Sequence, residues 1–272
     1  MNRFTKWINQ KETDHYTKKL IKITEEIKLI SQNFDSFSID ELSKEFQKYK
    51  KQTKEEVAKN LKYVYAIVYV LFKKIYNITL HDVQLHGAIA LYEGNIAEMR
   101  TGEGKTYTSA LPTILNATIA PTHVVTVNEY LAKRDKEELE PLYTTLGFTV
   151  GLNLNEMNVT QKREAYNCDI MYSTANELGF DYLKDNMVPD LSYRVNQHGF
   201  NSTLIDEVDL VLIDEARTPL IIGQDSKSPI VPIMKANNIV ITLSPETDLK
   251  IDYKTRTVSL TNEGAEKVSK AY

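Results

Sequence analysis

A short loop, Met99–Thr106 (MRTGEGKT), constrains the fold of this chain more than any other stretch. Two glycines separated by one residue let the backbone turn tightly and direct successive N–H groups inward. Lys105 then supplies a mobile cation, and Thr106 supplies a hydroxyl that can hold Mg²⁺. These are the groups that bind a triphosphate. The pattern is the T-G-x-G-K-T variant, because Met99 stands where the strict phosphate-loop pattern has glycine; the competing interpretation is a glycine turn that merely precedes a helix.

The residues around this loop predict the setting that phosphate binding requires. Asn95–Met99 is short and mostly apolar, which predicts a strand, and Thr106–Ala117 has apolar residues at helical spacing. A strand, a loop and a helix in this order place the helix N-terminus, with its unpaired N–H donors and partial positive charge, beside the phosphates. Pro112 lies inside the predicted helix and predicts a kink or a local break.

The composition is that of a globular chain. Its 272 residues are 42% hydrophobic and 26% charged, enough for one full domain with attached segments. The net charge of -4 gives no overall basic signal, which weakens an interpretation based on non-specific nucleic-acid binding but leaves a local basic patch open. A single cysteine excludes an intrachain disulfide and fits the cytoplasm. The N-terminus is polar and has no secretory signal, and the apolar segment Tyr63–Phe72 is too short to span a bilayer, so we expect a buried helix there.

Residues 1–77 are predicted to be helical throughout. Apolar residues recur at helical intervals from Leu20 to Ile30, and capping boxes of the type S/T-x-x-E begin at Ser38 and Thr53. Basic residues on the first helix, Lys18, Lys19 and Lys22, have two interpretations. They form either a solvated face or a contact with anionic lipid or a membrane-bound partner.

The sequence pattern changes after Asn77, where short apolar or β-branched segments alternate with helical patterns. This alternation predicts a parallel sheet that binds ligands at the carboxyl ends of its strands. The predicted strands are His123–Asn128, Phe148–Leu152, Asp169–Ser173 and Thr203–Asp206.

A second chemical site is predicted at the end of the last of these strands, where Asp206 and Glu207 are adjacent. One carboxylate would organise Mg²⁺, and the other would orient and deprotonate the water that attacks the γ-phosphate. Asp214 and Glu215 also follow an apolar run and fit the pattern at least as well. We prefer Asp206 and Glu207, because the string D-E-V-D is similar to the D-E-A-D string of helicases, and we expect Asp214 and Glu215 to be exposed structural carboxylates.

Several longer strings together resemble SecA, the ATPase motor that drives preproteins through the SecY channel. The resemblance runs from about residue 80 to the end, where residues 251–264 (IDYKTRTVSLTNEG) are similar to the opening of the family's preprotein cross-linking domain. The other strings are HDVQL (81–85), EGNIAEMRTGEGKT (93–106), VVTVNEYLA (124–132), KREAY (162–166), GFDYLKDNM (179–187), DEVD (206–209) and IDEARTPLII (213–222).

The resemblance implies a fold and a division of the chain. It implies a RecA-like α/β domain of the DEAD-like helicase superfamily at 78–222, preceded by the helical segment 1–77. The start of the cross-linking domain would follow at 223–272.

The resemblance also implies roles for individual residues. Gln84 would recognise adenine, and Arg100 would lie beside the phosphates or the adenine pocket. Catalytic roles fall to Lys105, Asp206 and Glu207, and Mg²⁺ would be held by Thr106 and Asp206. The residues implied in ATP or ADP binding are Gln84, Arg100, Thr101, Gly102, Glu103, Gly104, Lys105 and Thr106.

The partners that the resemblance implies are the SecY channel complex, preproteins and anionic membrane lipid, with a homodimer or full-length SecA also possible. The protein would work in the cytoplasm, peripherally at the inner face of the cell membrane, and no nucleic acid is expected. Complete SecA proteins have a second nucleotide-binding domain that closes over the γ-phosphate, and the sequence to Tyr272 shows none. We therefore expect better nucleotide binding than hydrolysis. The alternatives are a non-catalytic nucleotide-binding fragment or, less favoured, a DEAD-like nucleic-acid helicase domain.

Overall fold

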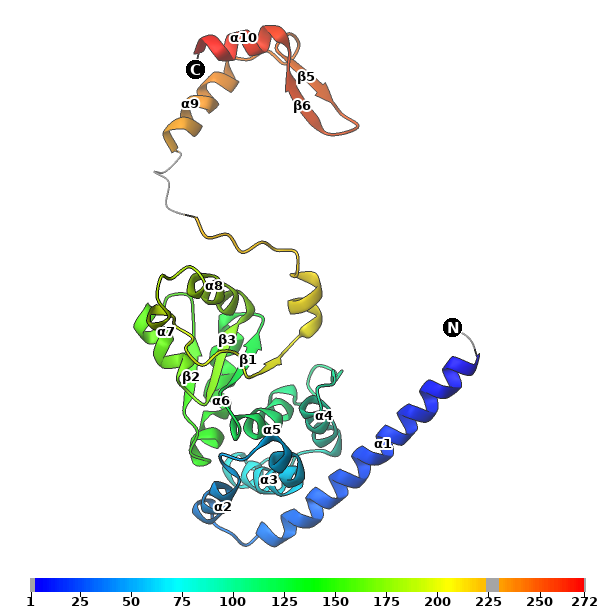
Figure 1. The fold of residues 1–272 in the computed structure, drawn as a ribbon. Coiled ribbons are helices and arrows are strands. Elements are labelled where there is room, and N and C mark those ends of the chain that lie inside the picture. The colour runs from blue at the N-terminus through cyan, green and yellow to red at the C-terminus, as the bar shows by residue number, and fades with distance from the viewer. Residues whose placement is uncertain (1–2, 224–229, 272) are drawn as a thin grey trace. The chain divides into compact units, whose positions relative to one another are not determined.

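The computed structural model describes residues 3–223 and 230–271. The predicted segments 1–77 and 223–272 include residues outside this described part, namely 1–2, 224–229 and 272. The chain divides into two compact units, Met1–Leu220 and Ile221–Tyr272 (Figure 1).

Helices form the N-terminal part of the first unit, as the sequence predicts. Both capping boxes are confirmed, because the Ser38 and Thr53 hydroxyls accept hydrogen bonds from the backbone N–H groups of Glu41 and Glu56 at 3.2 and 3.3 Å. The predicted buried helix is also confirmed, since most of residues 64–72 are buried. The elements are α1 (Arg3–Ser31), η1 (Gln32–Phe34), α2 (Ile39–Phe46), η2 (Gln47–Tyr49) and α3 (Lys54–Tyr76).

A four-stranded parallel sheet in the order β2-β3-β1-β4 confirms the predicted α/β fold (Figure 1). The pairing places Thr126 opposite Thr174, and Val125 opposite Ile205. The carboxyl ends of the strands therefore meet at one edge. The strands are β1 (Thr122–Thr126), β2 (Val150–Asn153), β3 (Ile170–Thr174) and β4 (Ser202–Ile205).

Helices cover both faces of this sheet. On one face, α5 and α6 pack in the same hydrophobic core as α3, around Val124 and Tyr172. On the other face, α7 and α8 pack around Met171. Because one core includes α3 and the sheet, the N-terminal helices support the α/β part directly. The remaining elements of the first unit are α4 (Asp82–Tyr92), α5 (Lys105–Ala117), α6 (Glu129–Thr145), α7 (Val159–Tyr166), α8 (Ala175–Asp185), η3 (Leu191–Tyr193) and η4 (Leu210–Asp214).

Near the phosphate loop, a predicted strand is wrong and a predicted helix break is absent. Asn95–Met99 is not a strand: Asn95 N–H bonds to the Ala90 carbonyl at the end of α4, Ile96 is 77% exposed, and no described strand pairs with the segment. An apolar run becomes a strand only where a neighbour pairs its backbone. Helix α5 also runs through Pro112 without a break, and the alternative, a kink, stays a prediction. The proline ring is buried in the core, so packing offsets the lost hydrogen bond.

The second unit is small and has its own centre. An antiparallel hairpin packs with α10, and the wholly buried Asp248 accepts hydrogen bonds from Ser244 N–H and Lys267 Nζ at 2.8 and 2.9 Å. A Cβ atom on Gly264 would lie 2.2 Å from the Asp248 carbonyl oxygen, so this close approach requires glycine. The elements are α9 (Ile230–Ile241), β5 (Leu249–Asp252), β6 (Thr257–Leu260) and α10 (Asn262–Ala271).

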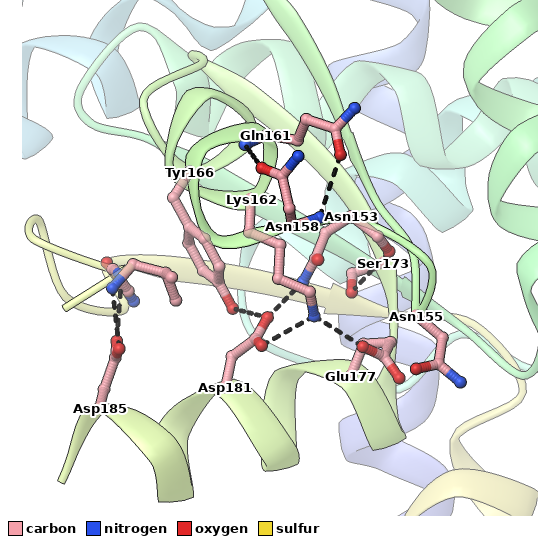
Figure 2. Close-up of polar contacts among 12 residues, drawn as sticks. Asn153, Asn155, Asn158, Gln161, Lys162, Tyr166, Ser173, Glu177, Asp181 and Asp185 are labelled. Atoms are coloured by element: carbon pink, nitrogen blue, oxygen red, sulfur yellow. Dashed lines mark hydrogen bonds and ion pairs between the residues drawn. The ribbon is translucent and has the colours of Figure 1, made fainter. Parts of the chain in front are cut away.

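A buried ionic network fastens α7 and α8 to the carboxyl ends of β2 and β3 (Figure 2). Lys162 Nζ lies between Glu177 Oε2 at 2.7 Å and Asp181 Oδ1 at 2.8 Å, and the Lys162 side chain is only 6% exposed. Asn153 Nδ2 and the Tyr166 hydroxyl donate to the other oxygen of Asp181. Burial alone would lower the pKa of Lys162, but the hydrogen bonds to the two carboxylates outweigh it and raise this pKa.

Removing the cation of this network should strongly destabilise the first unit. We expect Lys162→Met to lower the free energy of unfolding by about 3–5 kcal/mol, because two carboxylates would stay buried without a cation. The matched control is Lys133→Met, which removes an exposed pair with Glu137 and should have little effect. Urea denaturation measures both, and equal small losses would contradict this account of the network.

Candidate nucleotide-binding site

The predicted phosphate loop lies at the start of α5, and its backbone adopts the conformation that its glycines allow. Gly102 and Gly104 have φ angles of 87° and 80°, in the left-handed region that disfavours side chains. The loop is closed by a hydrogen bond from Glu103 N–H to the Arg100 carbonyl at 3.2 Å. The Glu103 carboxylate also accepts from Arg100 N–H at 2.9 Å. Arg100, Thr101, Gly102 and Glu103 are exposed, and Lys105 and Thr106 are half-buried.

Helix α5 places the loop near the carboxyl ends of the sheet strands. Four residues join Ala117, the end of α5, to Thr122, the start of β1. The C-terminus of α5 therefore lies near the amino end of β1. Helix α5 packs along β1 and β4, so its 13 residues run back toward the carboxyl ends of these strands. Sequence and topology together bring the loop to the edge where ligands bind in open α/β sheets.

Gln84, which the resemblance assigns to adenine, supports the loop through its carboxamide. Gln84 Nε2 donates to the Glu103 carbonyl at 3.0 Å, and Oε1 accepts from His81 N–H at 2.8 Å. The residue is 5% exposed. Adenine can therefore use only the second N–H or the second lone pair of this group, unless these bonds rearrange.

The preferred carboxylates stand where β4 ends. Asp206 is half-buried and its N–H donates to the Val125 carbonyl of β1 at 2.9 Å, which continues the strand pairing up to this residue. Glu207 is exposed, and its φ of 51° marks a sharp turn away from the strand. Its N–H donates to Asp206 Oδ1 at 3.0 Å.

The alternative carboxylates have a different setting. Asp214 ends η4, a five-residue π-helix, and Glu215 follows it. Both side chains are exposed, and their apolar run, Leu210–Ile213, forms no strand. The structure thus brings Asp206 and Glu207, but not Asp214 and Glu215, to the end of a sheet strand.

A carboxylate that the sequence interpretation missed lies near Asp206. Asp135 on α6 is 6% exposed and pairs with Arg134 at 2.6 Å. Burial raises the pKa of Asp135, the Arg134 bond opposes this rise, and the negative charge of Asp206 adds to it. The signal was present in the sequence, because Asp135 stands in line with Ala132, Leu139 and Leu142 on the buried face of a helix. A charge at such a position indicates a paired or functional group.

A comparison with known protein families identifies one that matches this chain. The sequence model of the SecA DEAD-like domain matches residues 3–268, nearly the whole chain. The chain belongs to the SecA DEAD-like domain family. Membership in this SecA family confirms the recognition made from the sequence strings, and it identifies a SecA-type ATPase motor domain.

Replacing Gly104 in the loop should destabilise the protein more than replacing Gly94, which lies before the loop. An added Cβ at Gly104 would lie 2.1 Å from Gln84 Nε2, whereas Gly94, with nearly the same φ of 81°, has nothing within 4 Å. Gly94→Ala should therefore lower the free energy of unfolding by about 1–2 kcal/mol, the cost of a left-handed backbone at a residue with a side chain. Gly104→Ala should lose about 1 kcal/mol more, because Gln84 is buried and must break its hydrogen bonds to move. Urea denaturation of both variants tests this, and equal losses would show that the Gln84 contact is unimportant.

Proposed function

We propose that this chain binds Mg·ATP and Mg·ADP at residues 100–106 as the nucleotide-binding part of a SecA-type protein translocase. The observation that carries the proposal is the open N-terminus of α5. Gly104 makes no side-chain cap, and the first turn contains no acidic residue. In contrast, α2, α3, α6, α7 and α8 each begin with a side chain that bonds a backbone N–H group. The uncapped donors of α5 match a phosphate ligand.

In this proposal, each site residue has a distinct task. Lys105 neutralises phosphate charge, and Thr106 and Asp206 hold Mg²⁺. Glu207 orients and deprotonates the attacking water, and its exposure on the turn after β4 leaves its carboxylate accessible for this task. Bound Mg²⁺ would supply charge neutralisation for the phosphates.

The other helices at this edge disfavour a nucleic-acid helicase. Glu129 is the first residue of α6, and Glu177 lies in the first turn of α8. The negative charge of Glu129 occupies the positive end of α6, and the Thr174 side chain already caps α8, so a phosphate backbone is disfavoured at both helices. ATP hydrolysis stimulated by RNA or DNA would favour the helicase, and nucleotide binding without any ATP cleavage would favour the non-catalytic alternative.

We further propose the SecY channel and preproteins as partners, on the strength of the family, and an anionic membrane surface as a docking place for α1. A basic groove on α1 and α3 supports the membrane contact, with Lys18 and Lys22 among its lining residues. Part of its positive charge is already used, because Lys19 pairs with Glu93 and Lys62 with Glu26. No helix within residues 3–223 and 230–271 is long and apolar enough to cross a bilayer.

Nucleotide binding can be tested directly with a fluorescent ADP analogue. We expect saturable binding in the presence of Mg²⁺, and a loss of about 10- to 100-fold in affinity for Lys105→Ala, since a charged hydrogen bond to phosphate is removed. The control is Lys133→Ala on the exposed face of α6, which should bind like the original protein. Unchanged affinity in Lys105→Ala would refute the assignment of the loop.

A further inference from the structure

The residue directly after the phosphate loop, Tyr107, sits where three helices meet. Its ring lies 5.5 Å from that of Phe72 at an interplanar angle of 69°, and 6.2 Å from that of Tyr76 at 32°. Phe72 and Tyr76 belong to α3, and Phe72 is wholly buried. The first turn of α5 is thus held against α3 by an edge-to-face contact with Phe72 and a tilted contact with Tyr76, and aromatic pairs of this kind prefer defined relative orientations.

The hydroxyl end of Tyr107 lies toward the third helix, α6. Interaction with the Glu138 carboxylate raises the pKa of Tyr107 to about 12. The Tyr76 hydroxyl donates to the backbone carbonyl of the same residue, Glu138, at 2.8 Å. Glu138 of α6 therefore lies beside both tyrosine hydroxyls, and Tyr76, on which the Tyr107 ring packs, cannot turn without breaking its hydrogen bond.

This anchorage has a geometric consequence for the loop. Successive side chains of an α-helix are about 100° apart around its axis. Once Tyr107 is fixed toward α3 and α6, the directions of Lys105 and Thr106 are fixed as well. The Tyr107 ring also passes 3.7 Å from the position of a Cβ on Gly104, so it borders the loop itself. No side chain caps α5, so this anchorage and the Gln84 bond add to the hydrogen bonds from Thr108 to the Gly104 carbonyl in holding the first turn in place.

We propose that Tyr107 is a positioning residue for phosphate binding: packed against Phe72 and Tyr76 of α3, it sets the rotation of the turn that carries Lys105 and Thr106. The proposal rests on the proposed nucleotide-binding function. It makes α3 and α6 part of the foundation of the nucleotide site. A turn fixed before binding has less entropy to lose when the phosphates bind, which increases affinity.

The test compares nucleotide affinity with stability in matched variants. Tyr107→Leu removes the ring and the hydroxyl, and Tyr107→Phe removes the hydroxyl alone. The control, Phe148→Leu, removes a similar edge-to-face pair with Phe46, 5.6 Å apart, just beyond the far end of α6. Fluorescent Mg·ADP titration gives the affinity, and urea denaturation gives the midpoint of unfolding.

We expect Tyr107→Leu to weaken Mg·ADP binding by about tenfold and Tyr107→Phe by about threefold. Phe148→Leu should shift the unfolding midpoint to a similar extent as Tyr107→Leu but leave the affinity within about twofold. Unchanged affinity in Tyr107→Phe together with equal weakening in Tyr107→Leu and Phe148→Leu would overturn the proposal, since stability alone would then explain the effect. If Tyr107→Leu fails to fold, unchanged affinity in Tyr107→Phe would be sufficient to overturn it. Absence of Mg·ADP binding by the original protein would instead refute the proposed function.

Discussion

The parallel pairing of β1 with both β3 and β4 determines where the candidate functional groups lie. Parallel strands end at the same edge, so Asp206 at the end of β4 and the N-terminus of α6 after β1 share one side of the sheet. The short link from α5 into β1 makes α5 run against the strands and turns the phosphate loop to that side. Antiparallel pairing of β4 with β1 would carry Asp206 to the opposite edge and separate the two halves of the site.

The helices that begin at the carboxyl edge of the sheet differ in how their N-terminal N–H groups are bonded. At α8 the first turn is capped by Thr174, and its Glu177 is neutralised by the buried Lys162. At α5 the first turn has no cap, and its loop is held from behind by Gln84 and Tyr107. The N-terminus of α8 is thus capped by a side chain, whereas the N-terminal N–H groups of α5 have no side-chain cap. A phosphate ligand fits the uncapped N-terminus of α5, and this contrast is the physical basis of the proposed function.

The features that depend on neighbouring residues were predictable from the sequence. The capping boxes at Ser38 and Thr53, the loop glycines and the four sheet strands all follow from local chemistry, and the structure contains them. The predicted strand at Asn95–Met99 failed because strand formation needs a distant partner. The electrostatic influence of Asp206 on Asp135 and that of Glu138 on Tyr107 act between different elements, so no local pattern predicts them. Only Asp135 itself, a charged residue on the buried face of α6, indicated the first of these interactions.

Hydrogen–deuterium exchange with and without Mg·ADP tests the central claim most directly, because it locates the ligand along the backbone. The account predicts slower exchange at residues 100–108, where loop and helix N–H groups would bind phosphate, and at 204–208 around the carboxylates of β4. Residues 210–216, which carry the alternative pair Asp214 and Glu215, should exchange as before. Protection at 210–216 without protection at 204–208, or no change in the loop at saturating nucleotide, would contradict the account.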